Sequence, residues 1–340
     1  MHPRTLMHAA LLLVLLFAET RAAHSQNPAP VVSGGVGFVA TRNGDNTFLQ
    51  PVIAPVGLLP IGDRVLIESR FDFRQFWFHP PGGDFNGSFF SSVEYLQADL
   101  ILAPQATLVV GRFLTPFNTF NERYTPFWIR NFQDAPIIFP MGTRTQGSSN
   151  GAMLRGVAAR GEKWQLNYLG FFSALSTVNK FRSGRAAGTR IGLYFPDARV
   201  EVGGSYERFL QDTRHNIFGA FIDWKPSDTS DLRGELAHSP SGTGYWIEGA
   251  YRFGQAGQTG IAGLQLVGRV QQFYRDQFLP GDSMPGLDTH QTEFGVNYYL
   301  PQEVRLSASY GRRFNAVRDI NIWNFAVTYR FLLPIAGGGQ

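Results

Sequence analysis

The chain has 340 residues, of which 30 are basic and 26 acidic, giving a formal net charge of +4. This excess is small and no run of basic residues occurs, so nucleic acid is not expected as a partner. Cysteine is absent, which excludes thiol catalysis, disulfides and cysteine-ligated metals. Glycine (38 residues) and phenylalanine (30 residues) are abundant. That composition favours many short strands over helices.

Residues 1–25 have the layout of a secretory signal peptide. Arg4 precedes the apolar run Ala9–Ala18, and a small-x-small site follows at Ala23-His24-Ser25, so we expect cleavage after Ser25. An uncleaved anchor helix is the alternative, but the run has ten residues and a span needs roughly 20. Every later apolar run is broken by charge, Gly or Pro, so no helical span is expected there.

The mature chain divides into segments of roughly ten residues that alternate between apolar and polar positions. Residues 63–78 show the pattern. One face carries the apolar side chains Val65, Ile67, Phe71 and Phe73. The other face carries the charged side chains Arg64, Glu68, Arg70, Asp72 and Arg74. A soluble β-sandwich would also alternate, but in a transmembrane barrel such a charged face lines a wet lumen. The mean hydropathy of −0.12 fits a barrel, because the two faces cancel.

The same alternation predicts strands over 261–275, 303–314 and 320–331. Tight turns fall at 60–63, 103–106, 160–163, 195–198, 226–231, 254–260 and 301–302. Other connections fall at 43–47, 79–88, 115–149, 175–186, 210–213, 239–243, 275–288 and 315–320. Short periplasmic turns alternating with longer external loops are typical of outer-membrane barrels. We therefore expect an all-β protein, a transmembrane antiparallel up-and-down β-barrel of about 16 strands, with both termini periplasmic.

The predicted barrel occupies residues 26–333 as one domain, and residues 334–340 are expected to form a disordered tail. Residues 31–60 carry the weakest strand pattern, because Pro51, Pro55 and Pro60 interrupt them. The glycine pairs inside strands, at 34–37 and 203–204, are interpreted as places where another strand or a loop approaches closely.

The connection at 115–149 is long and apolar, with eleven large apolar or aromatic side chains and four prolines. A structureless connection of this length is unexpected unless it is functional or packed. We expect it to fold inward against the barrel wall and to narrow the lumen.

Charged side chains in this connection and on the wall are the candidates for the pore constriction. They are Glu122, Arg123, Arg130, Asp134 and Arg144 from the connection and Arg70, Arg74 and Arg269 from the strands. Rings of charged side chains are one route to ion selectivity. The alternative is that Glu122–Arg123 and Arg130–Asp134 are local ion pairs that brace the connection.

The run Gly111-Arg112-Phe113-Leu114-Thr115-Pro116-Phe117 resembles the G-(K/R)-F…P-F stretch of the phosphate-selective porin O/P-like family. The resemblance implies a sixteen-stranded porin, often trimeric. It does not carry phosphate selectivity over, because the family's lysine-rich site has no counterpart in a chain whose lysines are Lys163, Lys180 and Lys225. Tyr329-Arg330-Phe331 is similar to the C-terminal signal read by the barrel assembly machinery, although nine residues follow Phe331.

Catalytic and metal-binding patterns are weak. His79, His215, His238 and His290 fall at strand–loop junctions, no H-E-x-x-H motif occurs, and no two histidines have ligand spacing. The run Gly147-Ser148-Ser149-Asn150-Gly151 has the spacing G-x-S-x-G, but it ends the long apolar connection and does not form the strand-to-helix elbow that a hydrolase needs. We therefore predict no enzyme activity, no cofactor and no metal.

The sequence predicts an outer-membrane porin of a Gram-negative bacterium. It would pass small hydrophilic solutes or ions passively, with a preference for anions if the lumen arginines dominate. Its expected partners are outer-membrane lipid, lipopolysaccharide, the assembly machinery and two further copies in a homotrimer. A closed barrel with an adhesive or structural role, a barrel hydrolase and a periplasmic soluble β-protein are the alternatives.

Overall fold

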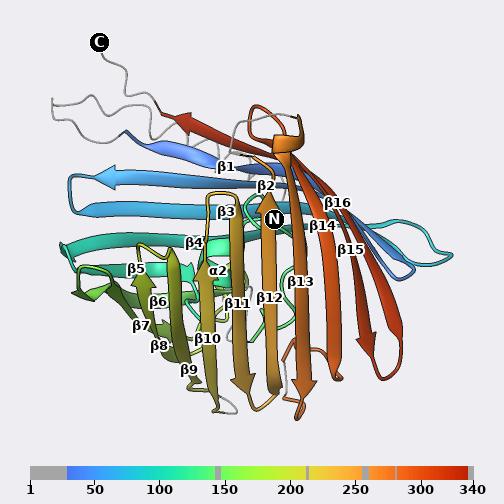
Figure 1. Ribbon diagram of the computed structural model, residues 1–340. Coiled ribbons are helices and arrows are strands. Elements are labelled where there is room, and N and C mark those ends of the chain that lie inside the picture. The colour runs from blue at the N-terminus through green and yellow to red at the C-terminus, as the bar shows by residue number, and fades with distance from the viewer. Residues whose placement is uncertain (1–28, 142–146, 212–213, 255–259, 280–281, 336–340) are drawn as a thin grey trace.

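The chain forms a closed antiparallel barrel in which each strand pairs with its sequence neighbours and β1 pairs with β16 (Figure 1). This computed structural model describes residues 29–141, 147–211, 214–254, 260–279 and 282–335. The predicted signal peptide, the candidate residue Arg144 and residues 336–340 of the predicted tail lie outside these ranges. No helix in the described ranges is long and apolar enough to cross a membrane.

The first eight strands are β1 (Val31–Asn43), β2 (Asn46–Ile61), β3 (Val65–His79), β4 (Asn86–Ala103), β5 (Ala106–Leu114), β6 (Ser148–Arg160), β7 (Gln165–Ala174) and β8 (Ala186–Phe195). The next eight are β9 (Val200–Phe209), β10 (Asn216–Trp224), β11 (Ser230–Ser239), β12 (Gly242–Arg252), β13 (Leu264–Arg275), β14 (Thr289–Tyr299), β15 (Val304–Asn315) and β16 (Asp319–Pro334). Short helices occur at α2 (Phe120–Tyr124), η1 (Asn179–Phe181) and η2 (Gly260–Gly263). The predicted fold class and the predicted number of strands are confirmed.

The proline-rich start of the chain does form strands, contrary to what its prolines suggest. Pro51, Pro55 and Pro60 all lie within β2, which pairs continuously with β1. On its other side β2 has no register partners in β3 at residues 50, 51, 54 and 55. Proline cannot donate a ladder hydrogen bond, so these breaks fall where the sequence removes the donor.

The last strand ends one residue beyond the predicted C-terminal boundary of the barrel at residue 333. β16 includes Pro334, and the backbone N–H of Ile335 donates to the carbonyl of Pro30 at 2.9 Å. The first two residues of the predicted tail are therefore tied to the start of β1.

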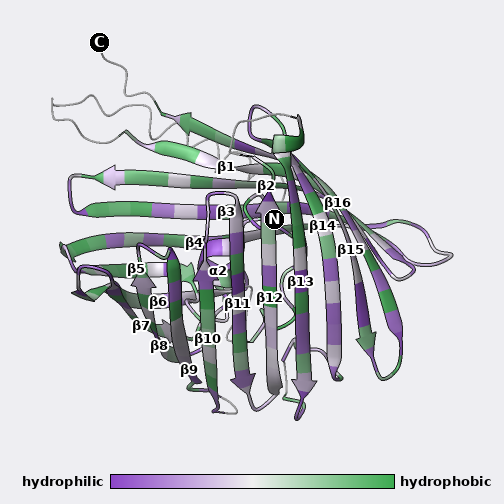
Figure 2. Ribbon diagram, in the orientation of Figure 1, coloured by the Kyte–Doolittle hydropathy of each residue, from purple (hydrophilic) through white to green (hydrophobic). Residues whose placement is uncertain are grey.

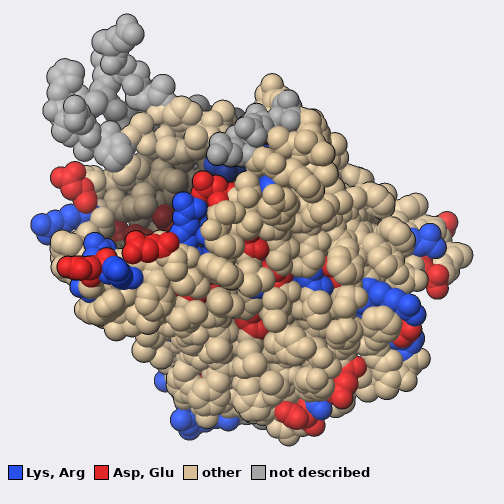
Figure 3. Space-filling model, in the orientation of Figure 1, with Lys and Arg blue, Asp and Glu red and all other residues tan. Residues whose placement is uncertain are grey.

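The outer wall is apolar in every strand. Each strand exposes at least one large apolar side chain: Phe38, Ile53, Trp77, Leu96, Val110, Leu154, Phe172, Ile191, Val202, Ile222, Leu236, Ile247, Leu266, Phe294, Leu306 and Phe325. Figure 2 shows the same alternation along the ribbons, and Figure 3 shows a mostly uncharged wall toward the viewer, with a few charged side chains across its middle and more at its ends. Such a band is what a barrel presents to lipid.

The inner wall is polar and charged. In β16, for example, Ile322, Asn324, Ala326 and Thr328 are buried and alternate with exposed apolar residues. At the end where the short turns gather, Figure 3 shows a hollow with acidic and basic side chains on its rim and inside it. A one-residue shift in register would exchange the two faces, so the alternation fixes the pairing of the strands.

Adjacent residues on β15 test which face meets lipid. Ala308 is exposed on the outer wall and Ser309 faces the lumen. Ala308→Arg should destabilise the folded barrel by about 2–4 kcal/mol, because it places a charge in lipid, whereas Ser309→Arg should cost less than about 1 kcal/mol. Urea unfolding in lipid vesicles measures both. Equal destabilisation by the two substitutions would contradict the assignment of faces.

Candidate functional site

Residues 115–147 connect β5 to β6, and we call them the inner segment. Its two ends meet at one point on the wall. The N–H of Thr115 donates to the carbonyl of Gly147 at 2.8 Å, and the Asn121 side chain donates to both Thr115 and Gly147 carbonyls, at 2.9 and 2.6 Å. Gly147 has a φ of +75°, a conformation that suits glycine. Hydrogen bonds therefore join the first and last residues of the inner segment to each other.

Glu235 on β11 holds the beginning of α2. Its Oε1 accepts hydrogen bonds from the Thr119 N–H at 2.7 Å, the Thr119 hydroxyl at 2.8 Å and the Phe120 N–H at 2.7 Å. The first N–H groups of a helix have no partner within the helix. Here a carboxylate of the barrel wall supplies that partner, which fixes the segment against β11.

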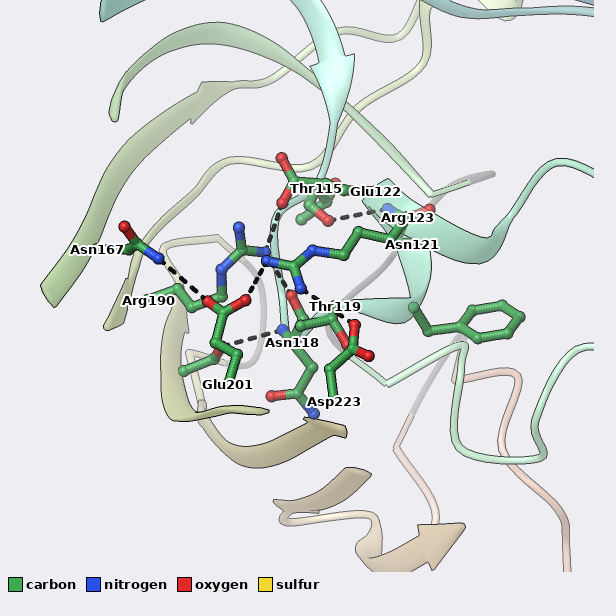
Figure 4. A network of polar contacts seen from close by, with 12 residues as sticks. Thr115, Asn118, Thr119, Asn121, Glu122, Arg123, Asn167, Arg190, Glu201 and Asp223 are labelled. Atoms are coloured by element: carbon green, nitrogen blue, oxygen red, sulfur yellow. Dashed lines mark hydrogen bonds and ion pairs between the residues drawn. The ribbon is translucent and has the colours of Figure 1, made fainter. Parts of the chain in front are cut away.

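Glu122 and Arg123, which also belong to α2, form ion pairs with different strands of the wall (Figure 4). Arg123 contacts Glu201 on β9 at 2.7 Å and Asp223 on β10 at 3.2 Å. Glu122 pairs with Arg190 on β8, which also donates to the carbonyl of Asn118. These contacts bring three carboxylates and two guanidinium groups together at the wall.

The Tyr124 ring separates this cluster from a second one. Its hydroxyl donates to Asp223, and its ring lies under the Arg233 guanidinium at 4.0 Å. The Arg233 Nε donates to Glu248 at 2.9 Å. Glu248 in turn accepts a hydrogen bond from Asn131 of the inner segment at 3.0 Å.

The far half of the segment is held mainly through its backbone oxygens. Arg269 donates to the Asp134 carbonyl at 3.0 Å, and Arg305 donates to the Arg130 and Phe127 carbonyls at 2.9 Å each. The Asp134 carboxylate accepts from Asn324 on β16 at 3.0 Å. Together with the Glu122–Arg190 pair on β8, these contacts carry the segment along the inner wall from β8 to β16.

Apolar packing completes the attachment. Phe120, Ile138 and Met141 pack with Phe209, Ile217, Trp246 and Phe273 in one buried cluster. At the other end, a Cβ on Gly35 would lie 2.4 Å from the Trp128 ring and one on Gly37 would lie 2.8 Å from the Phe127 ring. The close approach predicted for the glycines of β1 is confirmed, and the approaching part is the inner segment.

The wall of β3 to β6 carries its own ion pairs. Arg74 contacts Asp72 at 2.7 Å, and Arg155 on β6 pairs with Asp99 on β4. Arg70 is buried, and its guanidinium lies 5.4 Å from the centre of the Trp128 ring. Its Nε and one terminal nitrogen have no hydrogen-bond partner among the described residues.

The structure places the predicted constriction residues in three settings. Glu122, Arg123 and Arg74 are partly exposed and ion-paired, whereas Arg70 and Arg269 are buried, Arg269 beneath the Phe132 ring at 4.7 Å. Arg130 is partly exposed. The alternative of local ion pairs is wrong for the described residues, because Glu122 and Arg123 pair with the wall and not with each other.

Three arginines of the network were not singled out from the sequence, namely Arg155, Arg190 and Arg233, whereas Arg305 was expected on the lumen face of the strand 303–314. Their inward positions follow from the same alternation that identified Arg70 and Arg74. What the alternation does not give is the partner of each one, because every partner comes from another strand or from the inner segment.

The histidines and acids offer little for other chemistry. The His238 ring nitrogen Nδ1 lies 2.7 Å from the Thr243 hydroxyl. The His79 ring packs against the Phe85 ring, with their centres 4.6 Å apart. Within the described ranges, no group of three His, Asp or Glu side chains is arranged to hold a metal ion.

No protein-family model and no curated protein matches the sequence. Solved porin structures do match the fold. The anion-selective porin from Comamonas acidovorans is 11% identical, with a TM-score of 0.58, over 89% of this chain and 99% of that one. Salmonella typhi OmpF, in complex with daunomycin, is 14% identical, with a TM-score of 0.57, over 89% and 97%. A triple mutant of the Rhodopseudomonas blastica porin is 12% identical, with a TM-score of 0.56, over 88% and 100%.

At these identities the likeness establishes the fold. The chain has the general fold of outer-membrane porins, and its apolar outer wall is suited to a lipid bilayer.

The attachment of the inner segment can be tested at Glu235. Glu235→Ala removes the acceptor of three hydrogen bonds, so the Thr119 and Phe120 amides should exchange with deuterium roughly tenfold faster or more, as expected for about 1–3 kcal/mol. Hydrogen exchange followed by mass spectrometry of peptides covering 115–125 measures this. Glu303→Ala, in the exposed turn between β14 and β15, is the control. Unchanged exchange in Glu235→Ala would refute the attachment.

Proposed function

We propose that the protein is a passive porin for small hydrophilic solutes or ions, narrowed by the inner segment. The observation that carries this proposal is the set of charged pairs inside the barrel. A packed core would bury both members of each pair. In three of the pairs the arginine remains partly open to solvent, as a water-filled pathway requires, whereas the Arg233–Glu248 and Arg269–Glu293 pairs are buried.

The more exposed member is the arginine in each of three pairs. Side-chain exposure is 23% for Arg74 against 3% for Asp72, and 36% for Arg123 against 10% for Glu201. It is 39% for Arg155 against 7% for Asp99. A passing ion would meet guanidinium groups first, with the carboxylates behind them. This supports a preference for anions.

A closed barrel is the second candidate. It is supported by the reach of the inner segment, whose contacts extend from Arg190 on β8, past Gly35 on β1, to Arg70 on β3. A segment bound over so much of the wall would seal a barrel if it also filled the centre.

We further propose a family, an oligomeric state, an export route and partners for this protein. Membership in the phosphate-selective porin O/P-like family is supported by the run 111–117, which lies at the end of β5 and the start of the inner segment. A homotrimer, export by the signal peptide at 1–25, and contacts with lipopolysaccharide and the assembly machinery are proposed on the sequence features given above. We propose no enzymatic activity.

Planar bilayer recording separates the two candidates. The purified barrel should give stepwise conductance, because the charged lumen admits water and ions. Deleting residues 118–141 should raise the size of each step. A silent wild-type protein that conducts only after this deletion would establish the closed barrel instead.

A salt gradient across the same bilayer tests selectivity. The wild-type reversal potential should have the sign of an anion-preferring pore. The double substitution Arg123→Gln with Arg155→Gln should shift it toward cations, because Glu201 and Asp99 lose their masking charges. Arg208→Gln, on the outer face of β9, should leave it unchanged. Cation preference in the wild type would refute the proposed selectivity.

A further inference from the structure

A cavity of about 430 Å³ lies at the end of the barrel where the longer connections gather. Three parts of the chain line it: the inner segment, the connection between β13 and β14, and the ends of β15 and β16. Its apolar lining includes Ile137, Met284, Leu287 and Ile320. The volume lies within the range of roughly 300–1,000 Å³ that is common for small-ligand sites.

Two arginines, Arg313 and Arg318, add positive charge to this lining. The Nε of Arg313 donates to the Gln291 side chain at 2.6 Å, which orients the guanidinium. Neither terminal nitrogen of Arg313 has a hydrogen bond to a described residue, and the same holds for the Arg318 guanidinium. Both arginines therefore have donors free for a ligand.

Two acids near the cavity, Asp282 and Asp319, are paired with arginines that do not line it. Asp282 contacts Arg275 at 2.9 Å and accepts from Ser241 at 2.8 Å, and Asp319 contacts Arg312 at 2.8 Å. Partial burial raises the pKa of Asp282, but its hydrogen bonds from Arg275 and Ser241 outweigh this and hold it below the usual range. Asp282 thus stays ionised and paired with Arg275, and the arginines of the cavity remain uncompensated by it.

Deeper in the barrel, Arg313 is within electrostatic reach of Glu293 and Asp134. Glu293 is paired with Arg269 at 2.7 Å, and Asp134 accepts a hydrogen bond from Asn324. The cavity therefore borders the charged network beneath the inner segment, and Glu293 of that network already has Arg269 as its partner.

We propose that this cavity binds small anions with an apolar body, such as aromatic or short-chain carboxylates. The carboxylate would take the guanidinium donors of Arg313 and Arg318, since a guanidinium grips a carboxylate through two parallel N–H groups. The apolar body would lie against Ile137, Met284 and Ile320 and gain free energy from leaving water. A role of this site for solutes that enter a pore rests on the proposed function. The binding of the anion to the cavity does not depend on it.

Calorimetric titration of the detergent-solubilised barrel with benzoate tests the site. Benzoate should bind saturably, and benzyl alcohol and acetate should bind at least roughly tenfold more weakly, because each lacks one half of the recognised structure. Arg313→Gln should weaken benzoate binding by about tenfold or more, and Arg313→Lys should recover part of it. Arg208→Gln is the control, because Arg208 is an exposed arginine on the outer face of β9, away from the residues that line the cavity, and should leave binding unchanged.

Three results would overturn the proposal: no saturable binding of benzoate, equal affinity for benzyl alcohol, or equal loss in Arg208→Gln and Arg313→Gln. Bilayer recordings separate this outcome from the fate of the proposed function. If the barrel does not conduct but binds benzoate through Arg313, the proposed binding site stands and the proposed pore is refuted. If the barrel conducts but does not bind benzoate, the proposed pore stands and the proposed binding site is refuted.

Discussion

A backbone N–H in the hydrocarbon interior of a membrane has no water to bond, so a sheet that crosses lipid must pair every strand on both sides. In this chain the pairing of β1 with β16 meets that requirement by closing the sheet. Closure forces alternate side chains to opposite surfaces, one in lipid and one in the lumen. The charges of the chain therefore collect inside the barrel, and the inner segment has to be accommodated among them.

Charges gathered in a narrow space need partners, and the inner segment supplies many of them. It offers a carboxylate to Arg190, a guanidinium to Glu201 and Asp223, and backbone oxygens to Arg269 and Arg305. Removing one partner from such a network leaves a desolvated group unpaired, which costs more than the net gain of the bond. The segment and the wall thus hold each other in place, and the solvent-exposed members of the pairs give the lumen its electrostatic character.

The barrel could be predicted from the sequence because both of its signals are local. Alternation in stretches such as 303–314 needs only neighbouring residues, and so does the position of each turn. The inner segment could be predicted to pack, since a connection containing Trp128 and Phe120 cannot stay in water. Its partners could not be predicted: Glu235 meets Thr119 across 116 positions of the chain, and nothing local to either residue encodes that contact. Local pairing of Glu122 with Arg123 looked equally reasonable in the sequence, but the strands bring Arg190 and Glu201 within reach.

The absence of cysteine makes one measurement especially direct. A single Arg123→Cys substitution puts the only thiol of the chain on the inner segment, where the account places it beside a water-filled, conducting lumen. A charged, water-soluble thiol reagent should then change the current of each open channel in a discrete step and should leave the cysteine-free wild type untouched. Open channels that the reagent never affects, with the thiol intact by mass spectrometry, would show that the inner segment does not border the conducting path.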